Sequence, residues 1–136
     1  MAELRLSVGG RQYGGWKAIQ VIRSIETLAG SFDLDVSDRW GGQDVPWPIV
    51  EEDECRVEID GVTVIDGYVD RRRLAISADQ RSLGYSGRDR AAALVDCSAL
   101  LDKWTFRNAS VLEVARKVAE PFGIQVSLQA GLVLPK

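Results

Sequence analysis

The feature that most constrains the fold of this chain is a repeated alternation of apolar and polar residues. It is clearest where Phe32, Leu34 and Val36 are separated by Asp33 and Asp35. Successive side chains of a strand point to opposite faces, so this pattern predicts a strand with one buried face and one face in water. The two aspartates are therefore expected on a solvated face rather than in a catalytic carboxylate pair.

The same alternation recurs along most of the chain, separated by turn residues. Residues 4–8 run into Gly9-Gly10, and residues 55–59 reach Asp60-Gly61, a strong signal for a tight hairpin. Asp66-Gly67 is expected to bend the chain or form a bulge. Further strands are expected at residues 16–25, 32–36, 62–65, 74–77 and 82–86. The sequence predicts a mainly β (α+β) fold, an antiparallel β-barrel-like domain of about seven strands.

The pattern changes toward the C-terminus, where one or two short helices are expected. Residues 89–95 are alanine-rich, with Asp89 near the helix start. Ser110 and Glu113 have the spacing of a capping box, and Pro121 with Gly123 should end that second helix. A strand is expected from Ile124. We predict a β-barrel-like domain over residues 1–100, and over 101–136 the helix-containing start of a following domain that is truncated here.

Composition argues against most enzymes. The 136 residues include no histidine, which removes the commonest general base and transition-metal ligand. Cys55 and Cys97 lack metal-site spacing; two buried free thiols are favoured, and a disulfide between them stays open. The acidic run 51–54 reads as a solvated loop rather than a cation site. No catalytic, cofactor-binding or metal-ligating residues are predicted.

The net charge of −3 and pI of about 5.0 provide no general attraction for nucleic acid, and no membrane span or leader is expected. Six arginines are clustered within residues 71–90. Because strand residues alternate between faces, these six cannot all point the same way. A protein interface is favoured for them over a solvated surface, and nucleic acid is the least favoured partner. The tryptophans suit either the core or an interface. These arginines are Arg71, Arg72, Arg73, Arg81, Arg88 and Arg90; the tryptophans are Trp16, Trp40, Trp47 and Trp104.

Several short motifs, in this order and spacing over residues 4–124, resemble the baseplate hub protein family of phage Mu-like contractile tails. The resemblance extends to the helix that ends in Pro121-Phe122-Gly123-Ile124. The motifs are Gly14-Gly15-Trp16, Arg23-Ser24-Ile25-Glu26, Ala29-Gly30-Ser31-Phe32, Ser37-Asp38-Arg39-Trp40, Asp66-Gly67-Tyr68-Val69-Asp70, Ser86-Gly87-Arg88-Asp89 and Leu94-Val95-Asp96-Cys97-Ser98-Ala99.

The resemblance implies a virion structural protein of a phage, prophage or tail-like particle. Such hubs are homotrimers in which each copy has two related barrels. The resulting pseudo-sixfold ring joins the sixfold tail tube to the threefold spike. The implied partners are the protein itself, the spike and other tube and baseplate proteins, and the implied location is the virion baseplate after synthesis in the bacterial host cytoplasm. This chain would supply only the first barrel.

Two alternatives come from other functional classes. An oligonucleotide-binding barrel would use Arg71–Arg73 and exposed aromatic side chains as a charged, stacking groove. A carboxylate-based glycan hydrolase is a more distant alternative, because no carboxylate spacing in the sequence favours it. The hub interpretation therefore predicts a structural role with no enzyme activity.

Overall fold

The computed structural model describes residues 2–37, 47–78 and 81–132. The chain divides into two compact units, Met1–Ala92 and Ala93–Lys136, and each is described by itself below. The domain boundary that we place near residue 100 stays a prediction. No helix in the described ranges is long and apolar enough to cross a membrane.

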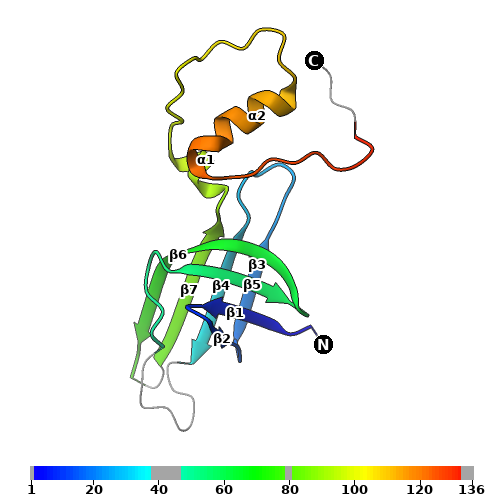
Figure 1. Ribbon diagram of the computed structural model, residues 1–136. Coiled ribbons are helices and arrows are strands. Elements are labelled where there is room, and N and C mark those ends of the chain that lie inside the picture. The colour runs from blue at the N-terminus through cyan, green and yellow to red at the C-terminus, as the bar shows by residue number, and fades with distance from the viewer. Residues whose placement is uncertain (1, 38–46, 79–80, 133–136) are drawn as a thin grey trace. The chain divides into compact units, whose positions relative to one another are not determined.

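The first unit is built on one antiparallel sheet with the strand order β2-β1-β5-β6-β7-β4-β3 (Figure 1). Its seven described strands curl into a half-barrel, which confirms the predicted fold class. The strands are β1 (Leu4–Val8), β2 (Arg11–Tyr13), β3 (Ala18–Ile22), β4 (Ser31–Ser37), β5 (Glu54–Ile59), β6 (Val62–Ile76) and β7 (Arg81–Asp89).

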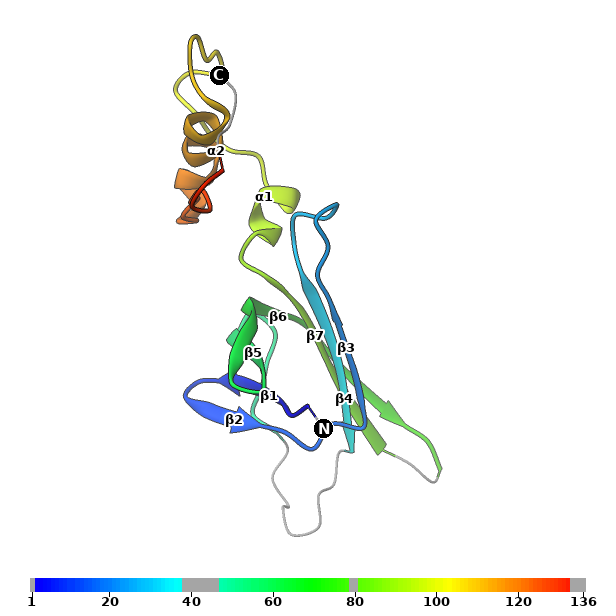
Figure 2. The ribbon, with the colours of Figure 1, turned by 90° about the vertical axis from the view of Figure 1, so that its right-hand side faces the viewer.

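The sheet has two wings that share strand β6 (Figure 2). The first wing consists of β2, β1, β5 and the N-terminal half of β6, which pairs with β5 up to Tyr68. The second wing consists of β3, β4, β7 and the C-terminal half of β6, which pairs with β7 from Arg71 to Ile76. Residues 62–65 and 74–77 were expected to form separate strands. This was wrong, because β6 runs without a break from Val62 to Ile76. The ladder to β7 runs from Gly67 to Ile76, and only the unpaired Asp70 interrupts its register.

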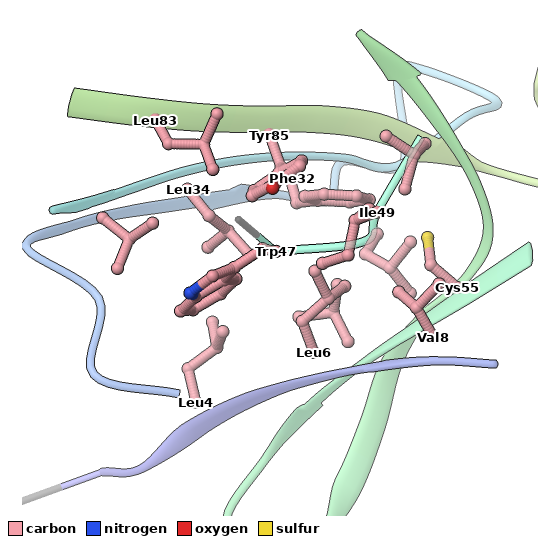
Figure 3. Close-up of a cluster of buried hydrophobic side chains, with 14 residues drawn as sticks. Leu4, Leu6, Val8, Phe32, Leu34, Trp47, Ile49, Cys55, Leu83 and Tyr85 are labelled. Carbon is pink, nitrogen blue, oxygen red and sulfur yellow. The ribbon is translucent and has the colours of Figure 1, made fainter. Parts of the chain in front are cut away.

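The core lies between the two wings (Figure 3). The alternating apolar residues of β1, β4, β5 and β7 point into it, as the period-two pattern predicted. Trp47 and Ile49 come from the segment before β5 and enter the same space. The Trp47 ring stacks on Tyr85 with centroids 6.2 Å apart and lies 5.0 Å from Tyr13. This segment therefore fills the interior that the curved sheet leaves open.

Two turn predictions are confirmed, and one strand is shorter than expected. Asp60 and Gly61 have φ values of 50° and 80°, the left-handed conformation that a tight two-residue hairpin requires. Gly9 and Gly10 likewise connect β1 to β2 with positive φ. Strand β3 spans only Ala18–Ile22, because its pairing with β4 ends where Ile22 meets Ser31. Ile25, expected on the buried face of that strand, is fully exposed.

The second unit begins within α1 (Ala92–Asp96) and contains α2 (Val111–Ala119) and a short 3₁₀ turn, η1 (Glu120–Phe122). The predicted capping box is confirmed: Ser110 N donates to Glu113 Oε2 at 2.6 Å, and Glu113 N donates to Ser110 Oγ at 3.3 Å. Gly123 ends the turn with φ 67°.

Two expectations for this C-terminal region were wrong. Helix α1 begins later than predicted, because β7 continues its pairing as far as Asp89, opposite Gly67. The predicted strand from Ile124 is absent from residues 123–132, where no described segment pairs with it. Instead the Arg116 guanidinium donates to the carbonyl of Val126 at 3.0 Å, so this stretch follows helix α2 as an irregular chain.

Candidate assembly site at the open edges of the sheet

The second wing has two strand edges that are open within the described chain. One is the outer edge of β3, the last strand in the sheet order. The other belongs to the C-terminal half of β6, because β5 pairs with β6 only as far as the pair Glu54–Tyr68. An open edge presents unpaired backbone N–H and C=O groups, which are a template for another strand. These edges are not predictable from the residue pattern, because the pattern of one strand does not identify its pairing partners.

A bulge at Asp70 decides which side chains the open part of β6 presents. Val69 opposes Gly87 and Arg71 opposes Ser86, so Asp70 has no partner in the ladder. One extra residue reverses the side-chain alternation beyond it. Val69 is buried in the core, and after the bulge the even-numbered residues face the core side, as the pair Leu74–Leu83 shows. Arg71 and Arg73 consequently point to the opposite face.

Two glycines allow the backbones of β6 and β7 to approach closely beside this bulge. A Cβ atom on Gly67 would overlap the carbonyl oxygen of Arg88, and one on Gly87 would overlap the carbonyl oxygen of Tyr68. Only glycine, which lacks a Cβ, can occupy both positions without moving the backbone. A bend or bulge was expected at Asp66-Gly67; the structure has close strand packing at Gly67 and the bulge three residues later, at Asp70.

Apolar side chains are exposed at both open edges, on the same face of the sheet. Ile19 on β3 is 51% exposed, and on β6 Leu74 and Ile76 are 51% and 61% exposed. Ile19 opposes the buried Leu34, and Leu74 opposes the buried Leu83, so these residues lie on the core side. Large apolar groups that continue a core face outward to a free edge are typical of a contact surface.

The loop before β5 covers the beginning of the open β6 edge. Glu52 N donates to the Val69 carbonyl at 2.8 Å, and Val69 N donates to the Asp53 carbonyl at 3.0 Å. Beyond these backbone bonds, Arg72 N donates to Glu51 Oε1 at 3.3 Å. The acidic run 51–54 was expected to be a solvated loop. Residues 51–53 do form a loop in which Glu51 and Glu52 are exposed, but its backbone is bonded to β6, and Glu54 begins β5. No cluster of potential metal ligands is found among the described residues.

The opposite face of the sheet carries arginines whose charges are paired with carboxylates. Arg73 contacts Asp33 and Asp35, and the hydrogen bond that its guanidinium donates to Asp33 is the main reason that the pKa of Arg73 is raised. Arg88 Nε lies 2.7 Å from Asp70 Oδ2. The two aspartates of β4, expected to be simply solvated, therefore hold Arg73 across β7.

Arg90 belongs to a second group of paired charges, on β5 and β6. Its guanidinium lies 3.3 Å from Asp66 Oδ1 and 3.5 Å from Glu54 Oε1. It also donates to the Tyr68 hydroxyl at 2.9 Å and lies over that ring. Because these partners are acidic, Arg90 has less attraction for a phosphate than an isolated arginine would have.

The tryptophans differ in burial, a question that the sequence left open. Trp47 is buried, and Trp16 packs against the core with its ring centroid 5.2 Å from that of Trp47. Trp104 in the second unit is 66% exposed. Trp40 lies outside the described residues.

The two cysteines differ in their surroundings, and this difference gives a direct test of the core. Both are free thiols, but Cys55 is buried while Cys97 is exposed, so the expectation that both are buried was wrong for Cys97. Burial, reinforced by Asp66, raises the pKa of the Cys55 thiol to about 12. Because the thiolate is the nucleophile, we expect iodoacetamide at pH 8 to modify Cys97 alone in the folded chain.

Intact-mass spectrometry would follow this reaction. One alkyl group per chain is expected under native conditions and two in denaturant. Native modification of Cys55 at the rate of Cys97 would contradict the buried position of β5. The Cys97→Ser variant, which should gain no native label, is the control.

Comparisons with known proteins agree over nearly the whole chain. Residues 3–89 match the family described as Mu phage baseplate assembly protein GpP-like, N-terminal, and residues 91–134 match the second domain of baseplate hub protein gp44-like. The baseplate hub protein gp44 of Escherichia phage Mu is 35% identical over 121 residues, which are 89% of this chain and 31% of that protein.

Two solved structures are also similar. The 43 kDa tail protein of prophage MuSo2 from Shewanella oneidensis has a TM-score of 0.85 and 34% identity, over 100% of this chain and 42% of that one. The tail protein from Neisseria meningitidis MC58 has a TM-score of 0.73 and 31% identity, over 88% of this chain and 34% of that one. The chain therefore spans about a third of the curated relative and belongs to the Mu-like baseplate hub protein family.

Proposed function

We propose that this chain is part of a structural component of a phage, prophage or tail-like baseplate hub, and that its second wing joins neighbouring barrel domains edge to edge. Membership of the hub family supports the structural role. The single observation that carries the joint is the pair of open strand edges on one four-stranded wing, β3-β4-β7-β6.

The directions of the strands suit such a joint. All neighbours in the wing are antiparallel, so with four strands the two edge strands run in opposite directions. When related wings follow one another around an axis, the β6 edge of one meets the β3 edge of the next antiparallel. In the full ring the neighbour is the related barrel, and for this chain alone a second copy takes its place. This arrangement gives the hydrogen-bond ladder that the wing already uses internally. The contact is heterologous, so it closes into a ring when the rotation between copies permits.

The apolar side chains at the edges suit the joint as well. Ile19, Leu74 and Ile76 lie on the core side of their strands and are at least half exposed. Pairing of β6 with a neighbouring β3 would bring them together on one face and remove apolar surface from water. Burial of such side chains contributes about 25 cal/mol per Å². The joint would thus extend the core of one domain into the next.

For the whole hub protein we propose a homotrimer in the virion baseplate, made in the host cytoplasm, that contacts the tail tube, the spike and other baseplate proteins. Two related barrels in each copy would form a pseudo-sixfold ring that matches the sixfold tube to the threefold spike. No catalytic step is assigned to it. Residues 101–136 would be the start of a second domain. The exposure of Trp104 and Leu132 supports this, because a completed domain would bury such residues.

The alternative of an oligonucleotide-binding barrel has weaker support. A phosphate-binding groove needs arginines whose charge is available to the ligand. Arg73, Arg88 and Arg90 each contact at least one carboxylate, which lowers the positive charge that these three arginines offer to a phosphate. No observation on the described residues favours nucleic acid over a protein partner.

Light scattering over a concentration series tests the joint. The wild-type chain should rise above its 15.0 kDa monomer mass as concentration increases, and a full-length hub product should be a trimer. Leu74→Lys places a charge in the buried face of the joint and should weaken association at least about tenfold, the effect of roughly 1.4 kcal/mol.

Val62→Lys is the matched control. Val62 is also exposed, but it lies on the half of β6 that pairs with β5. Equal losses in both variants, or a full-length product that remains monomeric, would contradict the proposal. Melting curves of both variants would separate weaker association from loss of fold.

A further inference from the structure

The apolar pattern of the proposed joint leaves one property unspecified, the register of the added strand. Strand side chains alternate with a period of two, so a slip of two residues returns every side chain to the same face. Ile19 would then still lie on the same side as Leu74 and Ile76, and the apolar surface would still be buried. Shape and burial alone therefore do not choose between registers that differ by two residues.

Glu51 lies where such a choice can be made. Its Oε1 accepts a hydrogen bond from Arg72 N at 3.3 Å, on the side of β6 away from β7. The N–H groups of a strand alternate in direction, so those of Leu74 and Ile76 point the same way as that of Arg72. Arg72 therefore holds the first outward donor beyond the loop, and a side chain of this same chain already occupies it.

The loop that carries Glu51 is fixed to the same strand. Glu52 N and the Asp53 carbonyl both bond to Val69, and Val50 N donates to Asp53 Oδ2 at 2.8 Å. Glu51 is thus held at the boundary between the covered and open parts of the edge. Charged groups at strand edges are a common device against unwanted pairing.

From this placement we propose that Glu51 is a register-setting residue of the joint. This inference rests on the edge-to-edge joint proposed above. By occupying the Arg72 donor, Glu51 stops an incoming β3 strand of a second copy at Leu74, so that the strand pairs with Leu74 and Ile76 only. Without Glu51, the edge is longer by one outward-facing donor, and a register displaced by two residues becomes available.

Intermolecular disulfides report this register. Ala75 lies between two outward-bonding residues, so at the joint it occupies a non-hydrogen-bonded position, where opposing Cα atoms come within disulfide range. Its side chain points to the non-core face, as do Ala18, Gln20 and Ile22 on β3. In a Cys97→Ser background, Ala75→Cys is combined in turn with Ala18→Cys, Gln20→Cys or Ile22→Cys. Mild oxidation at high protein concentration then traps whichever pair is opposed.

We expect one of the three pairs to give most of the cross-linked dimer when Glu51 is present. In Glu51→Ala, a second pair two residues away should gain yield at least about fivefold, the factor that one net hydrogen bond contributes. Glu51→Gln keeps an oxygen acceptor and should preserve the single pair. An unchanged distribution in Glu51→Ala would overturn the register role.

Amide hydrogen exchange of the same chain separates the two proposals. The Arg72 amide should exchange about fivefold faster in Glu51→Ala than in the wild type, whether or not copies associate. Cross-links in the wild type together with unchanged Arg72 exchange would overturn the role of Glu51 and leave the joint. Faster Arg72 exchange with no cross-link at any pair would overturn the joint, and with it the register that Glu51 is proposed to set.

Discussion

Replacing Gly67 with alanine is expected to lower the free energy of unfolding of the first unit by at least about 3 kcal/mol. The added Cβ would overlap the Arg88 carbonyl oxygen and lie 2.6 Å from the Cα atom of Asp89. Both obstacles are backbone atoms of β7, so no side-chain rotation relieves them. The strands must separate next to the bulge that presents the open edge of β6. Urea unfolding followed by circular dichroism measures the loss.

Gly14→Ala is the matched control for this prediction. A Cβ on Gly14 would approach nothing closer than the Leu4 carbonyl oxygen, at 3.9 Å. The same chemical change should therefore alter stability by less than about 1 kcal/mol, with either sign. Similar losses for the two variants would mean that close packing of β6 on β7 is not the cause. A stable Gly67→Ala chain would place the backbones farther apart than described here.

Trp47→Ala is expected to cost about 3–5 kcal/mol, the range measured for truncation of large buried aromatic side chains. Trp47 is only 8% exposed and lies against the rings of Tyr13, Trp16 and Tyr85. Its removal leaves a cavity between the two wings, a space that no described strand fills. The unfolding midpoint in urea should fall with little change in the slope of the transition.

Trp104→Ala provides the comparison, because Trp104 is 66% exposed and belongs to the second unit. Its loss should change the stability of the first unit by less than about 0.5 kcal/mol. If both variants unfold at the same urea concentration as the wild type, Trp47 does not hold the wings together. The fluorescence of the remaining tryptophans would report whether the core is still formed.

Much of the fold could be predicted because it follows from local patterns. The alternation at Phe32, Leu34 and Val36 identifies a strand and its buried face, and Asp60-Gly61 identifies a hairpin. The capping box at Ser110 identifies the start of α2. Each of these signals is contained within a few residues, so it can be recognised without knowledge of the tertiary structure. Misplaced ends, as at β3, arose because a partner strand decides where pairing stops.

The candidate site could not be predicted in the same way. Asp66-Gly67 was recognised as a special dipeptide, but its effect depends on Arg88, which is distant in sequence and opposes Tyr68 in the sheet. The role of Glu51 depends on a single hydrogen bond to Arg72, 21 residues away. Arg73 likewise looks like a free positive charge in the sequence until its partners Asp33 and Asp35 on β4 are located. These features are properties of strand pairing, which one sequence does not display.

The sharing of β6 between the wings has a mechanical consequence. A single run of 15 residues belongs to both wings, so the two are connected by covalent backbone as well as by side-chain packing. A pull on the outer edge of one wing is transmitted along that strand to the other wing without first crossing the core. In the proposed edge-to-edge joint, β6 would carry tension from one wing to the other through its covalent backbone. The core then has only to maintain the angle between the wings.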